Sequence, residues 1–102
     1  MYIHNTTFIV DSCLVAQFLD WARLSFIPEA RDSGYFNNVT MARILTEIQP
    51  DTVNIAIQMT AQSLNETLEW HAITAAPLID DLIARLGANR VMFFATSMEI
   101  IQ

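Results

Sequence analysis

The sequence contains no lysine, and its five basic residues are all arginines, scattered along 102 residues. With a formal net charge of −6, the chain offers no positively charged patch of the kind that attracts a phosphate backbone or an anionic lipid surface. We therefore expect neither nucleic acid nor a membrane among the partners of this protein.

Cysteine is equally scarce, because Cys13 is the only one. A single cysteine excludes an internal disulfide and fits a reducing compartment. The chain also lacks an apolar run near the ~20 residues that span a bilayer. Its first residues lack the charged start and apolar core of a signal peptide. These absences predict a cytoplasmic protein, and the length predicts a single domain over residues 1–102.

Motifs that carry catalytic chemistry are absent as well. Gly34 and Gly87 are too far apart to form a phosphate-binding loop, and no serine has the glycine pattern of a nucleophile elbow. His4 and Cys13 have no third and fourth ligand at a spacing that suits zinc. We therefore predict no catalytic residue, no metal and no cofactor, and the sequence leaves open whether the protein is an enzyme.

Charged residues make up only 16% of the chain and hydrophobic residues 53%. Typical soluble domains carry about 25% charged residues. So few charges cannot cover the surface of so small a body. Either apolar surface stays exposed to water, or a partner covers it.

The predicted secondary structure has the order β-α-β-β-α-β. Runs rich in β-branched and aromatic residues predict strands at Tyr2–Asp11, Tyr35–Glu47, Asp51–Gln62 and Arg90–Ile101. Apolar residues at spacings of three and four predict helices over Cys13–Ile27 and Ser63–Leu86. This order is typical of a ferredoxin-like α+β fold, in which a four-stranded antiparallel sheet carries both helices on one face.

Prolines and glycines are expected to shape the helix ends. Pro28 disfavours helical geometry in the residue before it, so the first helix should bend or end there and leave one short turn before Gly34. Pro77 should kink the second helix, which Ser63 caps at its start. Gly34 and Gly87 are expected to cap the two C-termini in a left-handed conformation.

Several predicted strands are apolar on both faces. In the last strand, Val91 and Phe93 point one way, while Met92, Phe94 and Met98 point the other. Two helices can cover only one face, so we expect a homodimer that stacks sheet on sheet, as in a dimeric α+β barrel. The alternative is a strongly twisted sheet whose loops shield the apolar residues near its ends.

Polar residues on the strands form the best candidate for a ligand-binding site. Asn54 and Gln58 share one face of the third strand, and further polar residues are able to join them from neighbouring strands. The complete candidate set is His4, Asn5, Arg43, Asn54, Gln58 and Thr96. Because buried polar groups need hydrogen bonds, the set predicts either a structural network across a dimer or a small pocket for an unidentified small molecule.

The second histidine, His71, follows Trp70 on the apolar stripe of the second predicted helix. A histidine in such a stripe is typical of a packed helix position. We therefore expect His71 to pack in the core rather than to act as a ligand or a base.

Short segments spread over nearly the whole chain carry a family resemblance. They are Asn5–Asp11, Phe18–Trp21, Ile27–Pro28, Ser33–Phe36, Arg43–Leu45, Gln58, Ser63–Leu64, Phe94–Thr96 and Glu99–Ile101. With these segments the chain resembles a group of short bacterial proteins catalogued as a domain of unknown function. The resemblance implies a ferredoxin-like fold and supplies no activity. Relatives usually carry a histidine where this chain has Phe26, so any chemistry of that histidine is lost here.

Three functional interpretations follow. The first is a non-enzymatic homodimeric interaction or structural domain. The alternative is a small-molecule-binding protein or an enzyme of the dimeric α+β barrel type, with a pocket between sheet and helices, which rests on analogy of fold. RNA-recognition modules share the β-α-β-β-α-β order, but they stack bases on exposed sheet aromatics in a basic surround. The acidic charge of this chain argues against that third interpretation.

Overall fold

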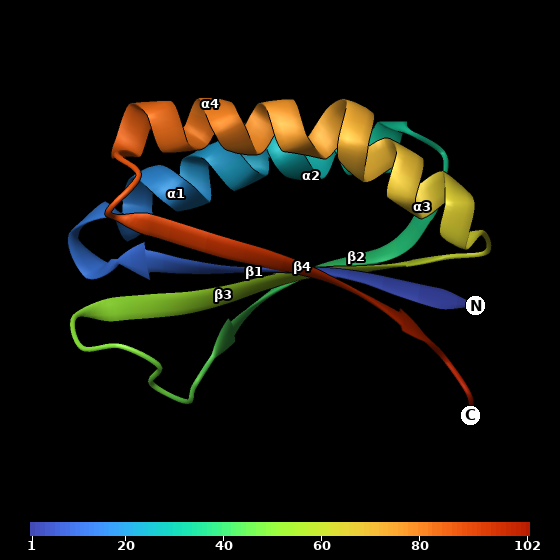
Figure 1. Cartoon of the computed structure of the whole chain (residues 1–102), viewed down its shortest axis with the longest axis horizontal. Helices are drawn as coiled ribbons and strands as arrows, with labels where there is room; N and C mark the ends of the chain where they lie inside the picture. Colours follow the sequence, from blue (N-terminus) through green and yellow to red (C-terminus); the bar gives the residue numbers. More distant parts are fainter.

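The computed structural model describes residues 1–102 and has the β-α-β-β-α-β order expected from the sequence (Figure 1). Its strands are β1 (Tyr2–Asp11), β2 (Phe36–Ile44), β3 (Thr52–Ala61) and β4 (Val91–Glu99). Strand β1 has the predicted bounds, and the other three are shorter than predicted by one to three residues at each end.

Each predicted helix is a continuous rod of several segments. The first rod contains the 3-10 turn η1 (Ser12–Leu14), α1 (Val15–Trp21), the π-helical segment η2 (Ala22–Phe26) and α2 (Ile27–Asp32). The second contains α3 (Leu64–Trp70), the π-helical segment η3 (His71–Ala75) and α4 (Ala76–Leu86). No helix of the structure is both long enough and apolar enough to cross a membrane.

Neither proline ends its helix, so of the two outcomes expected at Pro28, a bend or an end, the second does not occur. Ile27 and Ala76, which precede Pro28 and Pro77, each donate their backbone N–H to the carbonyl oxygen five residues earlier. Such a π-turn widens the helix where the proline ring would otherwise collide with the carbonyl of the preceding turn. The chain therefore stays helical through Pro28 to the end of α2 at Asp32.

The predicted caps are present. The Ser63 hydroxyl accepts a hydrogen bond of 3.2 Å from the backbone N–H of Glu66 at the start of α3. Gly34 follows α2 with φ of +79°, and Gly87 follows α4 with φ of +107°. Because side chains other than glycine rarely adopt these angles, both positions require glycine.

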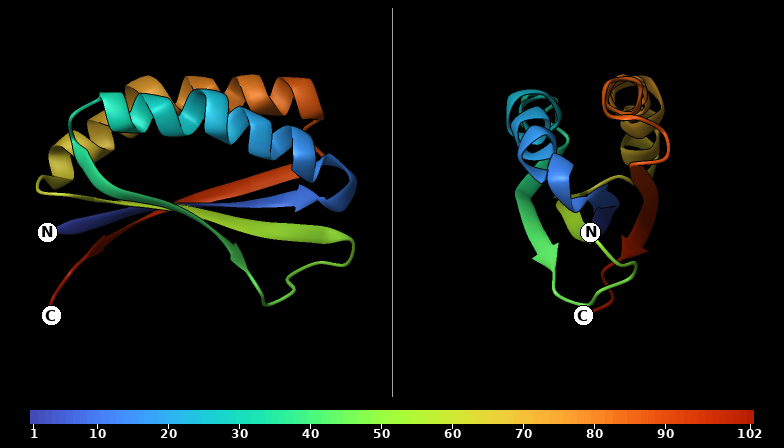
Figure 2. Two further views of the ribbon diagram at one scale, coloured as in Figure 1. Left: turned by 180° about the vertical axis from the view of Figure 1, so that it is seen from behind. Right: turned by 90° about the vertical axis from the view of Figure 1, so that its left-hand side faces the viewer.

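The four strands form one antiparallel sheet in the order β2-β3-β1-β4. Both helical rods lie on the same face, which we call the helix face, and the opposite face, the open face, carries no helix (Figure 2, right). The sheet is strongly twisted, and its edge strands β2 and β4 curve toward the open side. The ferredoxin-like fold predicted from the sequence is thereby confirmed.

Strand alternation assigns the residues to the two faces. On the helix face, a core of 19 buried residues includes Phe8, Ile57 and Val91 from the strands and Phe18 and Ile79 from the rods. The open face consists of Ile3, Asn5, Thr7, Ile9 and Asp11 of β1, Asn37, Thr40, Ala42 and Ile44 of β2, Thr52, Asn54, Ala56, Gln58 and Thr60 of β3, and Met92, Phe94, Thr96 and Met98 of β4.

A β-bulge in β2 changes which of its residues reach each face. Asn37 pairs with Thr60 and Thr40 pairs with Gln58, so β2 uses three residues where β3 uses two. Asn38, at the bulge, has φ of +55°, a conformation that asparagine tolerates better than most residues. Beyond the bulge the alternation is reversed, which places Arg43 on the helix face opposite Ile55.

Candidate functional site

The sequence-predicted site residues are divided between the two faces of the sheet. Asn5 pairs with Gln58 on one side and with Thr96 on the other, and Asn54 lies farther along the same open face. His4 lies on the helix face, as does Arg43. The structure thus brings four of the six residues to one face, and their role in ligand binding stays a prediction.

At the polar centre of the open face, Asn5 and Asn54 are buried, whereas Gln58 and Thr96 are exposed. Asn5 is 8% exposed, and its Nδ2 donates to Thr7 Oγ1 at 3.0 Å. Asn54 Nδ2 donates to the backbone oxygen of Thr46 at 3.0 Å. None of the four cavities of the structure is lined by Asn5, Gln58 or Thr96. This packing supports a structural role for the amides rather than a pocket at the centre of the sheet.

Apolar side chains dominate the β4 side of the open face. Met92 is 51% exposed, Phe94 50% and Met98 37%, and all three project from β4 away from the helices. Asp11, at the end of β1, is the one charged residue of the open face, and it is paired with Arg90. A sheet face with only one charged residue and with exposed large apolar side chains is unusual in a protein whose formal net charge is −6.

A histidine pair lies under the second helical rod. His4 Nε2 and His71 Nδ1 are 3.0 Å apart, and the His4 ring packs edge-on against Trp70 with 5.9 Å between ring centroids. Burial, reinforced by the proximity of His71, lowers the pKa of His4 from 6.5 to about 4, and burial also lowers the pKa of His71. Both rings are therefore neutral at pH 7, and they share one N–H···N hydrogen bond.

The two histidines are 67 positions apart in the sequence, and no residue spacing predicts the contact between them. His71 is half-buried, in agreement with the expectation that it packs on its helix. Neither histidine lines any of the cavities, so neither is placed to exchange a proton with a bound molecule.

The histidine pair makes stability depend on pH. The folded-state pKa of His4 lies below its unfolded value, so its contribution is fully present above pH 6.5 and is lost as the pH falls toward 4. We expect the free energy of unfolding to drop by about 3 kcal/mol from this residue over that interval. Urea denaturation followed by tryptophan fluorescence at pH 7.5 and 4.5 measures the loss.

The comparison with His4→Phe isolates this effect from the titration of carboxylates. The variant lacks the titrating ring and keeps a similar apolar volume beside Trp70, so its unfolding free energy should fall much less between the two pH values. Equal losses in the wild-type protein and in the variant would show that the histidine pair does not produce the pH dependence.

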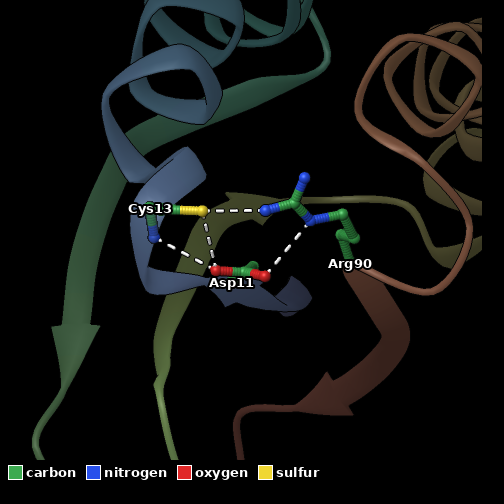
Figure 3. Close-up of polar contacts among 3 residues, drawn as sticks. All are labelled: Asp11, Cys13 and Arg90. Carbon is green, nitrogen blue, oxygen red and sulfur yellow. Dashed lines mark hydrogen bonds and ion pairs between the residues drawn. The ribbon is translucent and has the colours of Figure 1, made fainter.

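The one cysteine belongs to a polar cluster where β1 ends and β4 begins (Figure 3). The Cys13 thiol donates to Asp11 Oδ1 at 3.1 Å, Arg90 Nε donates to Asp11 Oδ2 at 3.2 Å, and Arg90 Nη2 lies 2.8 Å from the sulfur. The hydrogen bond to the Asp11 carboxylate raises the pKa of Cys13, against the opposing charge of Arg90. The sulfur is therefore kept as a thiol, and the cluster ties the end of β1 to the start of β4.

The reactivity of Cys13 tests this arrangement. Asp11→Asn removes the negative charge that stabilises the thiol and leaves Arg90 in place, so the pKa of Cys13 should fall toward its ordinary value. We expect alkylation by iodoacetamide at pH 7.5 to accelerate several-fold, because the thiolate is the reacting species. Arg90→Gln should slow the reaction instead. An unchanged rate in the Asp11→Asn protein, measured by mass spectrometry, would contradict the assignment.

The largest cavity, about 470 Å³, is an open cleft between the first helical rod and the β2–β3 side of the sheet. Six of its nine lining residues are hydrophobic, and two of the others are arginines. We call it the arginine cleft; it is lined by Ser12, Val15, Leu19, Arg23, Met41, Ala42, Arg43, Val53 and Ile55. Arg43 reaches it because the bulge in β2 turns that side chain to the helix face.

Sequence reasoning named Arg43 but missed Arg23 and the cleft itself. The spacing of Val15, Leu19 and Arg23 could have indicated this wall of the cleft. Residues four positions apart lie on one side of a helix. No group of three or more histidine, cysteine, aspartate or glutamate side chains is arranged to hold a metal ion.

Solved structures with this architecture come from several sources. A Deinococcus radiodurans protein, named provisionally as an antibiotic biosynthesis monooxygenase, matches with a TM-score of 0.75 and 16% identity over 100% of this chain and 94% of its own. The protein Atu4242 from Agrobacterium tumefaciens matches with a TM-score of 0.65 and 14% identity, over 100% of this chain and 95% of its own.

A third structure, described as a dimeric ferredoxin-like protein from an uncultured marine organism, matches with a TM-score of 0.61 and 8% identity over 99% of this chain and 95% of its own. At these identities the likeness shows the fold alone, and it agrees with the ferredoxin-like class derived above. The search of curated proteins found no match to the sequence. A family profile does match, over residues 1–101, and it confirms the resemblance seen in the sequence: the chain belongs to the family described as "Domain of unknown function (DUF4286)".

Proposed function

We propose that this protein is a homodimeric interaction domain whose two copies stack through their open sheet faces. The observation that carries the proposal is the open face, which has a single charged residue at one end and exposes Met92, Phe94 and Met98 along β4. Because two helical rods cover only the helix face, a second sheet is the simplest cover for the other. A neighbour of the same fold is described as a dimeric ferredoxin-like protein, which supports a dimer here.

The open face is suited to a copy of itself. A two-fold axis through the face would set its apolar β4 side against an equivalent, largely apolar surface, with the Asp11–Arg90 ion pair confined to one end of the face. The edge strands β2 and β4 curve toward the open side (Figure 2), and a second sheet with the same curvature would close the arrangement into a barrel.

Sedimentation equilibrium at micromolar concentration tests the proposal. The chain has a mass of 11.6 kDa, and we expect the species in solution to have twice that mass. A protein that sediments at 11.6 kDa over the whole micromolar range would contradict the dimer.

Nucleic-acid binding is poorly supported by the same face. Phe94 is the only aromatic residue on it, and no cation accompanies that ring. Base stacking on a sheet needs exposed aromatics within a positive surround. We therefore propose that the sheet contacts protein rather than RNA or DNA.

A second candidate function is the binding of a small molecule between sheet and helices. The arginine cleft favours it, because this cavity has the apolar walls and the few polar groups typical of ligand sites. The Deinococcus radiodurans neighbour, which is named provisionally as a monooxygenase, has the same fold. Neither His4 nor Gln58 lines the cleft, so its polar chemistry comes from the arginines and Ser12.

A further inference from the structure

The arginine cleft has two walls of different origin. Val15, Leu19 and Arg23 project from one side of the first rod, and Arg43 projects from β2 beside Val53 and Ile55 of β3. The apolar side chains therefore form the interior of the cleft, with one guanidinium contributed by each wall.

The two cleft arginines have no intramolecular partner. Of the five arginines, Arg85 pairs with Asp81 at 3.0 Å and Arg90 with Asp11 at 3.2 Å. Arg23 and Arg43 make no ion pair and no side-chain hydrogen bond, and no aspartate or glutamate lines the cleft. Both arginines are exposed, so the cleft places two unpaired, water-accessible guanidiniums beside apolar walls, a local positive site in a chain with 11 acidic residues.

From this juxtaposition we infer that the cleft binds an amphipathic carboxylate, a small molecule with an apolar body and one anionic end. The guanidinium is a planar fork that matches a carboxylate with two parallel hydrogen bonds, and the apolar walls take the body of the ligand. A volume of about 470 Å³ falls within the usual range for small-molecule sites. The inference deepens the second candidate function by naming its ligand class, and it does not depend on the homodimer.

Other anionic ligands fit the cleft less well. A nucleotide or a free phosphate needs several convergent backbone N–H donors, which glycine-rich loops provide, and neither Gly34 nor Gly87 lies in the cleft. A small inorganic anion would leave the apolar side chains of Val15, Leu19 and Ile55 in contact with water. The walls therefore select a ligand with an apolar body.

Octanoate and 2-naphthoate are suitable probes, with octanol and 2-naphthol as neutral counterparts of nearly the same shape. Titrations followed by ¹H–¹⁵N correlation spectra locate binding, since shifts at Val53, Ile55 and Arg43 report the cleft. Arg23→Gln and Arg43→Gln each remove one positive charge. Arg31→Gln is the matched control, because Arg31 is an exposed, unpaired arginine of α2 that lies outside the cleft.

We expect one or both carboxylates to shift cleft residues and to bind about tenfold more tightly than the corresponding alcohol. Each cleft variant should lose about tenfold in affinity, while Arg31→Gln should bind as the wild-type protein does. Thermal unfolding of each variant checks that the fold is retained.

Two outcomes would overturn the inference. Equal affinity for carboxylate and alcohol at the same residues would remove the anionic assignment and leave small-molecule binding standing. No cleft shift with any probe up to about 10 mM, an affinity too weak for a specific site, would remove the small-molecule function as well. Neither result bears on the dimer, which sedimentation tests separately.

Discussion

Replacing Phe94 by aspartate is expected to convert the proposed homodimer into a folded monomer. Phe94 is 50% exposed at the middle of β4 on the open face, so the monomer does not depend on it for its core. In a sheet-to-sheet dimer, two aspartates would lie unpaired between apolar surfaces. Burial of such charges costs several kcal/mol, so the dimer dissociation constant should rise by about 100-fold or more. Light scattering coupled to size-exclusion chromatography measures the change.

Leu24→Asp is the matched control for this experiment. Leu24 is 79% exposed on η2, where it lines a groove with residues of both helical rods, and the substitution adds the same charge. The control protein should remain a dimer. Dissociation in both variants would indicate a general effect of charge, and retention of the dimer in Phe94→Asp would remove the open face from the interface.

Replacing Phe8 by alanine is expected to cause a large loss of stability. Phe8 is fully buried on the helix face, and its ring packs against Phe18, Trp21 and Phe26 with centroid distances of 4.9, 5.8 and 6.1 Å. Alanine removes these contacts and leaves a cavity between the sheet and the first rod. The free energy of unfolding should fall by about 3–5 kcal/mol, as measured by urea denaturation.

The cross-strand neighbour of Phe8 provides the comparison. Phe93 pairs directly with Phe8 on the same face but is 38% exposed at the edge of the sheet. Phe93→Ala should therefore cost only about 1–2 kcal/mol. If both variants lost the same free energy of unfolding, the ring of Phe8 would not be a main contact of the core.

The strand pattern explains why the architecture could be predicted from the sequence. Val53, Ile55, Ile57 and Met59 alternate with polar or small residues, and this period of two placed β3 with one face on the core. The split of Val91 and Phe93 from Met92 and Phe94 was predicted in the same way and is confirmed by the register of β4 against β1.

The candidate site was harder to predict, because it depends on local irregularities. The sequence pattern grouped Arg43 with Asn54 and Gln58. Because the bulge near Asn38 inserts one extra residue into β2, the Arg43 side chain instead lies on the helix face. Asparagine tolerates a positive φ but does not require one, so the bulge has no decisive signature in the sequence.

Contacts between elements that are far apart in the sequence could not be predicted from it either. The hydrogen bond between His4 and His71 depends on how the second rod lies across β1, which periodicity does not define. Pro28 did mark an irregularity in the first helix, but the π-turn that lets the helix continue follows from hydrogen bonding around it.

Isotope-filtered NOE spectroscopy shows directly where two copies of this protein meet. In a sample that mixes ¹³C-labelled with unlabelled chains, every filtered NOE joins two different molecules. Stacking through the open face predicts intermolecular NOEs from the methyl groups of Ile3, Met92 and Met98. Intermolecular NOEs from Leu24 or Ile73, which are exposed on the helical rods, with none from β4, would contradict the proposed dimer.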